Sequence, residues 1–110
     1  MDNLLYTSPD LYSWTLQPVN WGVGNEPLGD VFYNSKRSCH TVLLRPFWGI
    51  RRAGYRETTD WKTFSPFVPC IQPDSLDAPL TEIYGMPAIE YGGMYIGFPH
   101  LYHNLKSAHN

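Results

Sequence analysis

The sequence predicts an all-β fold, and its composition and a repeated segment lead to this prediction. Aromatic residues make up 15% of the 110 residues, only 16% are charged, and there are ten prolines and nine glycines. Such a composition disfavours long helices and favours short strands joined by tight turns. Two similar segments, residues 8–14 and 58–64, recur 50 residues apart. A chain of this length has room for one small domain.

The repeated segments are SPDLYSW at residues 8–14 and TTDWKTF at residues 58–64. Each has a small hydroxyl residue two places before an Asp and an aromatic residue four places after it. The side chains of Asp10 and Asp60 are expected to accept hydrogen bonds from backbone N–H groups just ahead of them. The pattern therefore predicts the same kind of turn twice, each followed by a strand.

Behind each turn a β-hairpin is expected. The first hairpin pairs DVFYN at residues 30–34 with CHTVLLRP at residues 39–46. The second pairs EIYGMPAIEY at residues 82–91 with MYIGFPHLYH at residues 94–103, joined by Gly-Gly. Gly-Gly between two apolar runs is a strong hairpin signal.

Two more strands are expected between the hairpins. Residues 49–60 can form a third strand beside the first hairpin, and residues 61–70 can form a fourth. Pro66 and Pro69 suit an edge strand, because a missing N–H there breaks no hydrogen-bond ladder.

The spacing of the two hairpins is typical of a propeller blade. Asp30 and Glu82 open the corresponding strands 52 residues apart, a longer period than that of solenoid repeats. The sequence predicts a single partial β-propeller domain over residues 1–110, with antiparallel four-stranded blades. Its expected parts are the outer strand of a preceding blade (1–20), one full blade (29–70), the inner strands of the next blade (80–104) and a tail (105–110). A small β-sandwich with coincidentally similar halves is the alternative.

These segments resemble proteins of glycoside hydrolase families 32 and 43 and related uncharacterised proteins, which are five-bladed propellers. Their blades carry a Ser-x-Asp-x-x-x-Trp turn, which SPDLYSW matches closely and TTDWKTF loosely. RRAGYRETTD and LTEIYGMPAIEYGGMYIGFPHLYH also resemble such proteins. The resemblance covers residues 8–103 and implies hydrolysis of glycosidic bonds. The chain lacks the Trp-Met-Asn-Asp-Pro, Arg-Asp-Pro and Glu-Cys motifs of family 32, and two blades are fewer than such a propeller needs.

Asp30 and Glu82 are the catalytic candidates. The innermost strand of each propeller blade lines the central channel, and both residues begin an expected inner strand. Glycosidic cleavage uses one carboxyl group as acid and another as base or nucleophile. Asp30 also resembles the acidic residue that opens a blade in these hydrolases. A turn residue, for Asp30, and a solvated strand start, for Glu82, are the alternatives.

Side chains around the same strands are the candidates for holding a sugar: Trp48, Arg52, Tyr84, His100 and Tyr102. Aromatic rings can stack on the C–H faces of sugars, and phenols offer hydrogen bonds. Alternation along a strand places Glu82 and Tyr84 on one face. Burial in a core is the alternative for the rings. The arginines at positions 45, 51, 52 and 56 are expected on a solvated strand face or paired with Glu57 and Asp60.

Other classes of partner find little support. With a formal net charge of −2 and a pI near 6.0, the chain lacks the excess positive charge typical of proteins that bind nucleic acid. There is no apolar run long enough to cross a membrane and no signal-peptide pattern at the N-terminus. No metal or cofactor is expected, because no Cys or His spacing suits one. Cys39 and Cys70 are expected as buried free thiols, with a disulfide as the alternative.

The expected partners are a carbohydrate ligand and either further copies of the chain or missing blades. An incomplete propeller leaves an unpaired strand edge, which invites association. The chain by itself is expected to be inactive, because catalysis needs the whole set of groups held in place. A non-catalytic module that binds carbohydrate or associates with itself is the alternative to an enzyme.

Overall fold

The computed structural model describes residues 4–19, 28–46 and 49–103, and all regular structure in these residues is β. Every pair of hydrogen-bonded strands is antiparallel. The prediction of an all-β fold is therefore confirmed. No helix long and apolar enough to cross a membrane occurs in the described part of the chain.

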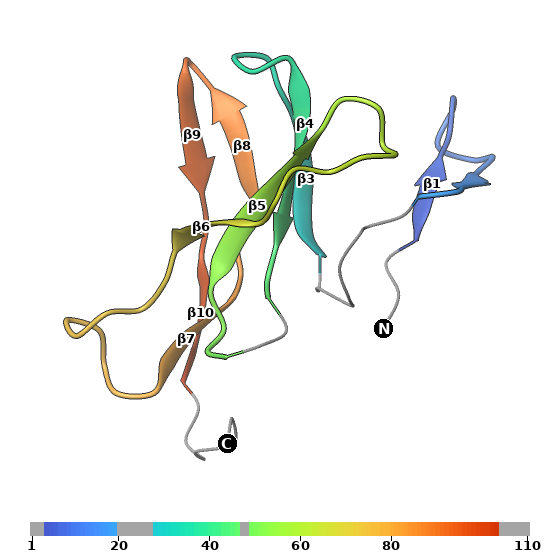
Figure 1. Cartoon of the computed structure of the whole chain (residues 1–110). Helices are drawn as coiled ribbons and strands as arrows, with labels where there is room; N and C mark the ends of the chain where they lie inside the picture. The colour runs from blue at the N-terminus through green and yellow to red at the C-terminus, as the bar shows by residue number, and fades with distance from the viewer. Residues whose placement is uncertain (1–3, 20–27, 47–48, 104–110) are drawn as a thin grey trace.

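Four strands form the largest sheet (Figure 1). They are β3 (Leu28–Asn34), β4 (Cys39–Leu44), β5 (Ala53–Thr58) and β6 (Val68–Ile71), and each pairs with the next along the chain. The strands expected over residues 30–70 are thus present, although β6 starts later than predicted. β4 is central and is buried along almost its whole length. β6 is exposed throughout and contains Pro69, as an edge strand can.

The second hairpin is bent into two short pairs. β7 (Thr81–Gly85) pairs with β10 (His100–His103), and β8 (Ala88–Tyr91) pairs with β9 (Met94–Gly97). Gly92 and Gly93 join β8 to β9 with φ of 59° and 80°, the left-handed backbone that a two-residue hairpin turn requires.

The predicted continuous strands 82–91 and 94–103 are wrong in one respect, because each is broken in the middle. The breaks fall at Pro87 and Pro99, and proline lacks the N–H that a ladder needs. The Phe98 N–H donates to the Pro87 carbonyl at 2.9 Å and ties the two breaks together.

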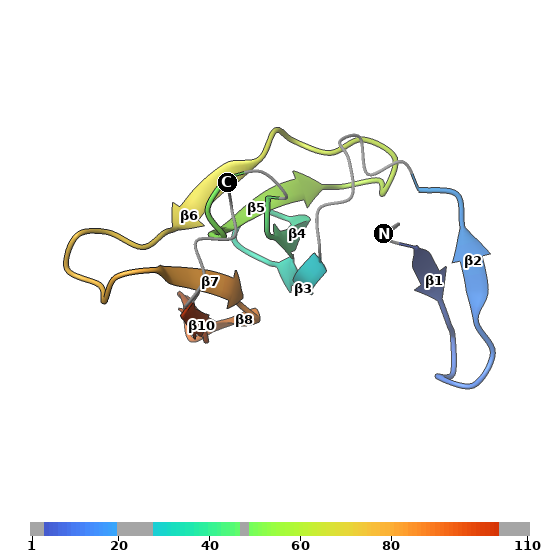
Figure 2. The ribbon, with the colours of Figure 1, turned by 90° about the horizontal axis from the view of Figure 1, so that it is seen from below.

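The bent hairpin packs as a second layer against the four-stranded sheet, as the view from below shows (Figure 2). Small and branched apolar side chains fill the core: Val42, Leu43, Leu44, Ala53, Ile83 and Ala88. Backbone contacts join the layers, since the Ile83 N–H donates to the Arg51 carbonyl at 3.0 Å.

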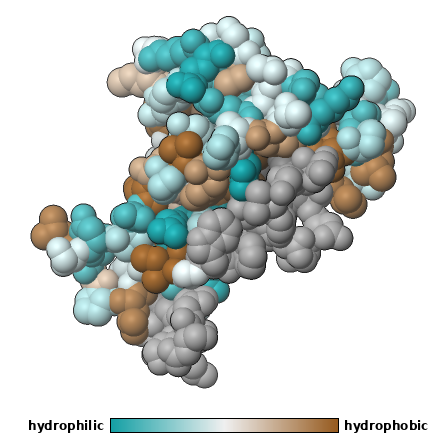
Figure 3. All heavy atoms as spheres, in the orientation of Figure 1, coloured by the Kyte–Doolittle hydropathy of each residue, from teal (hydrophilic) through white to brown (hydrophobic). Residues whose placement is uncertain are grey.

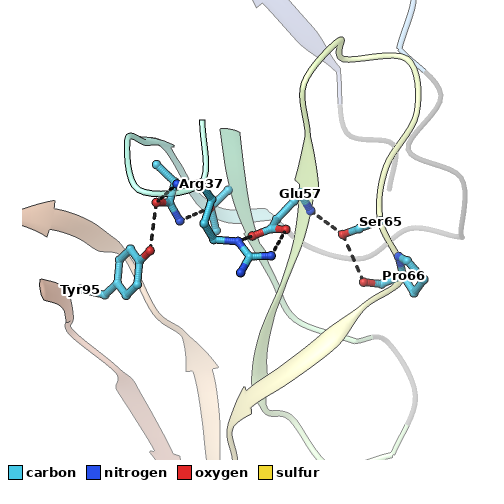
Figure 4. Close-up of polar contacts among 7 residues, drawn as sticks. Arg37, Glu57, Ser65, Pro66 and Tyr95 are labelled. Carbon is cyan, nitrogen blue, oxygen red and sulfur yellow. Dashed lines mark hydrogen bonds and ion pairs between the residues drawn. The ribbon is translucent and has the colours of Figure 1, made fainter. Parts of the chain in front are cut away.

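Polar side chains hold the ends of the two hairpins together (Figure 4). The Tyr95 hydroxyl on β9 donates to Asn34 Oδ1 at 2.9 Å. Arg37, in the β3–β4 turn, reaches back to Glu57 on β5, with Nη2 2.9 Å from Oε2. Tyr95 therefore fixes β9 to the end of β3, and Arg37 fixes the turn after β3 to β5.

The two cysteines lie in different surroundings and form no disulfide with each other. Cys39 is buried, and burial raises the pKa of its thiol. Cys70 is at the surface on β6, so the expectation of two buried thiols is wrong for this residue. An edge strand without a covering layer leaves one face of β6 open to solvent.

Residues 4–19 form a separate hairpin of β1 (Leu5–Thr7) and β2 (Thr15–Gln17). Figures 1 and 2 both show it apart from the other strands. A single outer strand was expected in residues 1–20. The short turn after β1 instead reverses the chain, so that two strands form.

The two predicted turns have the same geometry. Asp10 Oδ1 accepts from the N–H groups of residues 12 and 13, both at 2.9 Å. Asp60 Oδ1 accepts from those of residues 62 and 63, at 2.8 and 2.9 Å. The residue after each Asp, Leu11 or Trp61, has a positive φ, 72° or 57°. The prediction of a shared turn is confirmed.

The Asp60 turn gives a prediction for acid solution. Backbone N–H groups of Thr63 and Lys62 lower the pKa of Asp60 from 3.8 to about 2. Because the charged form accepts these bonds, the stability that Asp60 adds is complete above pH 3.8 and is lost as pH falls through about 2. A carbon-13 titration of the side-chain carboxyl should show a midpoint near 2. A midpoint at or above the ordinary value would show that the turn does not hold the carboxylate.

Candidate functional site

Two tyrosine rings lie side by side on the exposed face of β7 and β10. Tyr84 is 56% exposed and Tyr102 is 40% exposed. Their ring centroids are 6.1 Å apart, with 44° between the planes. Glu82 is directly opposite Tyr102 in the strand pairing, and alternation along β7 puts it on the same face as Tyr84.

Two arginines from the four-stranded sheet reach these rings. The Arg45 guanidinium, just after β4, is 4.6 Å from the centre of the Tyr84 ring, and its Nη1 donates to the Tyr84 carbonyl at 3.2 Å. The Arg51 guanidinium, just before β5, is 5.0 Å from the Tyr102 ring and 6.0 Å from the Tyr84 ring. All three distances from guanidinium to ring centre are within the range of cation–π attraction. We call Arg45, Arg51, Glu82, Tyr84 and Tyr102 the tyrosine–arginine cluster.

Glu82 anchors the cluster. Its side chain is only 6% exposed, and its Oε2 accepts from Arg51 Nη1 at 2.7 Å. A buried carboxylate of this kind needs a charged partner, because burial without one costs several kcal/mol, about 3–5 when the partner is removed. The ion pair holds the Arg51 guanidinium over the rings, so the donors of the cluster are positioned before any ligand arrives.

A hollow of about 380 Å³ lies beside the cluster, between the two layers. Arg45, Tyr84, Met86 and His100 are on its walls. His100, predicted as a sugar-binding residue, therefore lies next to Tyr84 without being a member of the cluster.

The structure thus brings together some of the residues predicted for the site. Glu82, Tyr84 and Tyr102 are in the cluster, with His100 beside it. Arg52 points elsewhere: its Nη1 donates to Gln72 at 3.3 Å, and its Nε is buried without a hydrogen-bond partner among the described atoms. Trp48 lies outside the described residues.

Asp30 has a different role from Glu82 in the packing. Its Oδ2 accepts from the Ala88 N–H at 3.0 Å, and its Oδ1 accepts from the N–H of Val31 at 2.8 Å. Asp30 therefore links β3 to the start of β8, on the other side of the Pro87 break from Glu82. Asp30 and Glu82 are 52 residues apart, but the turns of their hairpins, at residues 35–38 and 92–93, are further apart than that. The two carboxylates therefore lie at different distances from the turns of their hairpins.

The arginines of the cluster were missed by sequence reasoning. A solvated strand face was expected for the arginine group, but Arg51 pairs with Glu82 and Arg45 stacks on Tyr84. Arg56 is buried and donates to the Ser65 carbonyl at 3.0 Å. No local pattern predicts these partners, because they lie 31 and 39 residues away along the chain.

The arrangement can bind a flat ligand with polar edges. The rings offer apolar faces, and the guanidinium groups offer hydrogen-bond donors in fixed positions, with Glu82 holding Arg51 in place. Within the described residues there is no group of three or more His, Cys, Asp or Glu side chains placed to hold a metal ion. In comparisons with known proteins, no family model, no curated protein and no solved structure matches this chain.

Proposed function

We propose that this chain is a propeller-type carbohydrate-binding protein of the kind seen in glycoside hydrolase families 32 and 43, and that the tyrosine–arginine cluster holds the sugar. The observation that carries the proposal is the convergence of two exposed tyrosine rings with two guanidinium groups from the other layer. Rings beside fixed donors are what a sugar needs, since it has apolar C–H faces and hydroxyl edges.

The strand order supports a propeller blade. β3 to β6 follow one another in space as they do in the chain, which is the arrangement of a four-stranded blade. The next hairpin places β8 beside β3, as the inner strands of neighbouring blades lie. The shared turn at Asp10 and Asp60 supports a repeat.

Hydrolysis of a glycosidic bond is the second candidate, and Glu82 is the observation that favours it. Its carboxylate is buried beside the rings that would hold the sugar. Asp30 would be the second carboxylate, and further groups would come from other blades. Because cleavage requires all of these groups in register, we expect the 110-residue chain alone to leave aryl glycosides intact.

The proposed binding site can be tested on a panel of neutral and acidic oligosaccharides. We expect Tyr84→Ala and Tyr102→Ala each to weaken binding about tenfold, since a ring contact contributes about 0.5–1.5 kcal/mol beyond its buried area. Titration by intrinsic fluorescence or NMR shift measures the affinity. Tyr91→Ala is the matched control, because Tyr91 is 70% exposed on β8 and outside the cluster.

Equal binding by all three variants would contradict the cluster as the site. Failure of every oligosaccharide to bind the unchanged protein would contradict the carbohydrate ligand itself. The same samples, incubated with aryl glycosides, separate binding from cleavage. Turnover that disappears in Glu82→Gln and persists in Tyr91→Ala would move the conclusion from a binding protein to a hydrolase.

A further inference from the structure

One edge of β9 has no neighbouring strand among the described residues, where β9 pairs with β8 alone. In a hairpin with a two-residue turn, the residues flanking the turn, here Tyr91 and Met94, point their backbone groups at each other. The next residue, Tyr95, and then Gly97 therefore direct their backbone N–H and C=O groups to the opposite edge. This edge can accept another strand.

A groove lies between that edge and the four-stranded sheet. It has a volume of about 510 Å³, and its walls include Tyr55, Cys70, Ile71, Met86, Tyr95 and Pro99. Most of these side chains are apolar. On the side of the four-stranded sheet the lining comes from all four strands, β3 to β6, so a strand added to β9 would cover part of that sheet.

The β1–β2 hairpin resembles the strand pair β5–β6, which lies beside β4 in the large sheet. Thr7 pairs with Thr15 across the first turn, and 50 residues later the Ser65 N–H donates to the Glu57 carbonyl at 2.9 Å across the second. β1 therefore corresponds to β5, which is the third strand of the large sheet. In the large sheet β5 pairs with β4. β9 corresponds to β4, because each is the second strand of its hairpin. By the same correspondence, β1 would pair with β9.

We propose that the β1–β2 hairpin of one copy of this chain binds the β9 edge of a second copy, as β5 and β6 bind β4. The inference uses the blade-like strand order of the proposed function but does not depend on sugar binding. The hairpin and β9 lie on opposite sides of β3 and β4 (Figures 1 and 2). A second copy is therefore placed to supply the hairpin, whereas the chain's own hairpin faces away.

Exposed apolar side chains fit this partner. Tyr6, on β1, is 47% exposed, and Leu4, just before β1, is 62% exposed. On the receiving side, Phe98 is 60% exposed. Figure 3 shows apolar side chains both at the β1–β2 end of the molecule and on the side of β7, β9 and β10. Association would remove both sets from water.

The register of the contact follows from the large sheet. There Val42, the fourth residue of β4, is opposite Arg56 on β5. Gly97 is the fourth residue of β9, and Tyr6 is the residue 50 places before Arg56. Tyr6 is therefore opposite Gly97, where an aromatic ring can cover the missing side chain and enter the groove. Thr7 is then opposite Ile96.

The contact joins unlike surfaces, so it continues from copy to copy and closes into a ring or runs on as a filament. Each copy contributes one complete sheet and two half-sheets, each completed by a neighbouring copy, which makes two blades per copy. Propellers have roughly four to eight blades. Rings of two to four copies of 12.7 kDa, with four, six or eight blades in place of the five of families 32 and 43 and masses of about 25–51 kDa, are therefore expected.

Disulfide trapping tests both the partner and the register. In a Cys70→Ser background, Thr7→Cys with Ile96→Cys places two thiols on directly opposite residues, with Cβ atoms about 4.5–5.5 Å apart. We expect covalent dimers and larger species under mild oxidation. Thr15→Cys with Ile96→Cys is the matched control, because β2 is one strand further away, about 10 Å from β9, beyond the reach of a disulfide.

Each outcome bears on the proposal. Light scattering of the unchanged chain should show masses of 25 kDa or more that fall on dilution. For Tyr6→Asp, the protein concentration at which the assembly dissociates to monomer should be at least tenfold higher, while the circular dichroism spectrum stays the same. A monomer at every concentration would overturn the proposal, as would a disulfide within one chain or equal cross-linking of the control. Cross-linking without sugar binding would leave this inference standing and remove the proposed function alone.

Discussion

Gly54→Val is expected to destabilise the protein by about 3 kcal/mol or more, a large share of the roughly 5–15 kcal/mol that holds a domain together. Gly54 is buried on β5, where the pairing with β6 shifts register. A Cβ atom at this position would overlap the Phe67 ring and stand 2.5 Å from the carbonyl oxygen of Val68. Backbone cannot move aside as a flexible side chain can, so β6 would have to separate from β5.

Thermal unfolding followed by circular dichroism measures this effect. A loss of about 3 kcal/mol lowers the melting temperature by roughly 12–24 °C in a domain of this size. Gly85→Val is the matched control, since an added Cβ there meets nothing within 4 Å. Similar melting temperatures for Gly54→Val and Gly85→Val would show that β6 does not pack on β5 as described.

Leu43→Ala is expected to cost about 2–5 kcal/mol, the range for removing a buried leucine side chain. Leu43 is 5% exposed on β4 and borders both the hollow beside the tyrosine–arginine cluster and the groove beside β9. Its side chain therefore lies where the two layers meet. Loss of it should loosen the second layer first, because β7 to β10 have fewer strand partners than β4.

Denaturant unfolding gives the total cost, and amide hydrogen exchange shows where it falls. Faster exchange in β7 and β8 than in β4 is the expected result. Leu76→Ala provides the comparison, because Leu76 is 93% exposed and a surface change of this kind costs within about 0.5 kcal/mol. Equal stability of the two variants would mean that the second layer does not pack on Leu43.

The elements that depend on neighbouring residues could be predicted from the sequence. The turns at Asp10 and Asp60 were predicted because each Asp bonds to N–H groups two and three residues ahead. The Gly92-Gly93 turn was predicted because glycine accepts positive φ without strain. The all-β fold followed from the same local preferences. In each case the residues that interact are adjacent in the chain.

The candidate site depended on the tertiary structure. Tyr84 and Glu82 share a face through alternation along one strand, and this much was predicted. That Arg51 would pair with Glu82, and Arg45 stack on Tyr84, was not, because sequence alone shows charges but not which of them meet. The breaks at Pro87 and Pro99 were visible as prolines, but only the paired strands show that the hairpin bends there instead of ending.

By itself the sequence determined the fold class, the two repeated turns and the order of the four strands β3 to β6, since these arise from short-range hydrogen bonds and side-chain periodicity. The tertiary structure decided which side chains form the site and which strand edge stays open. Those depend on how the two layers pack, and a close pair such as Arg51 and Glu82 forms only when residues distant in the chain are buried together.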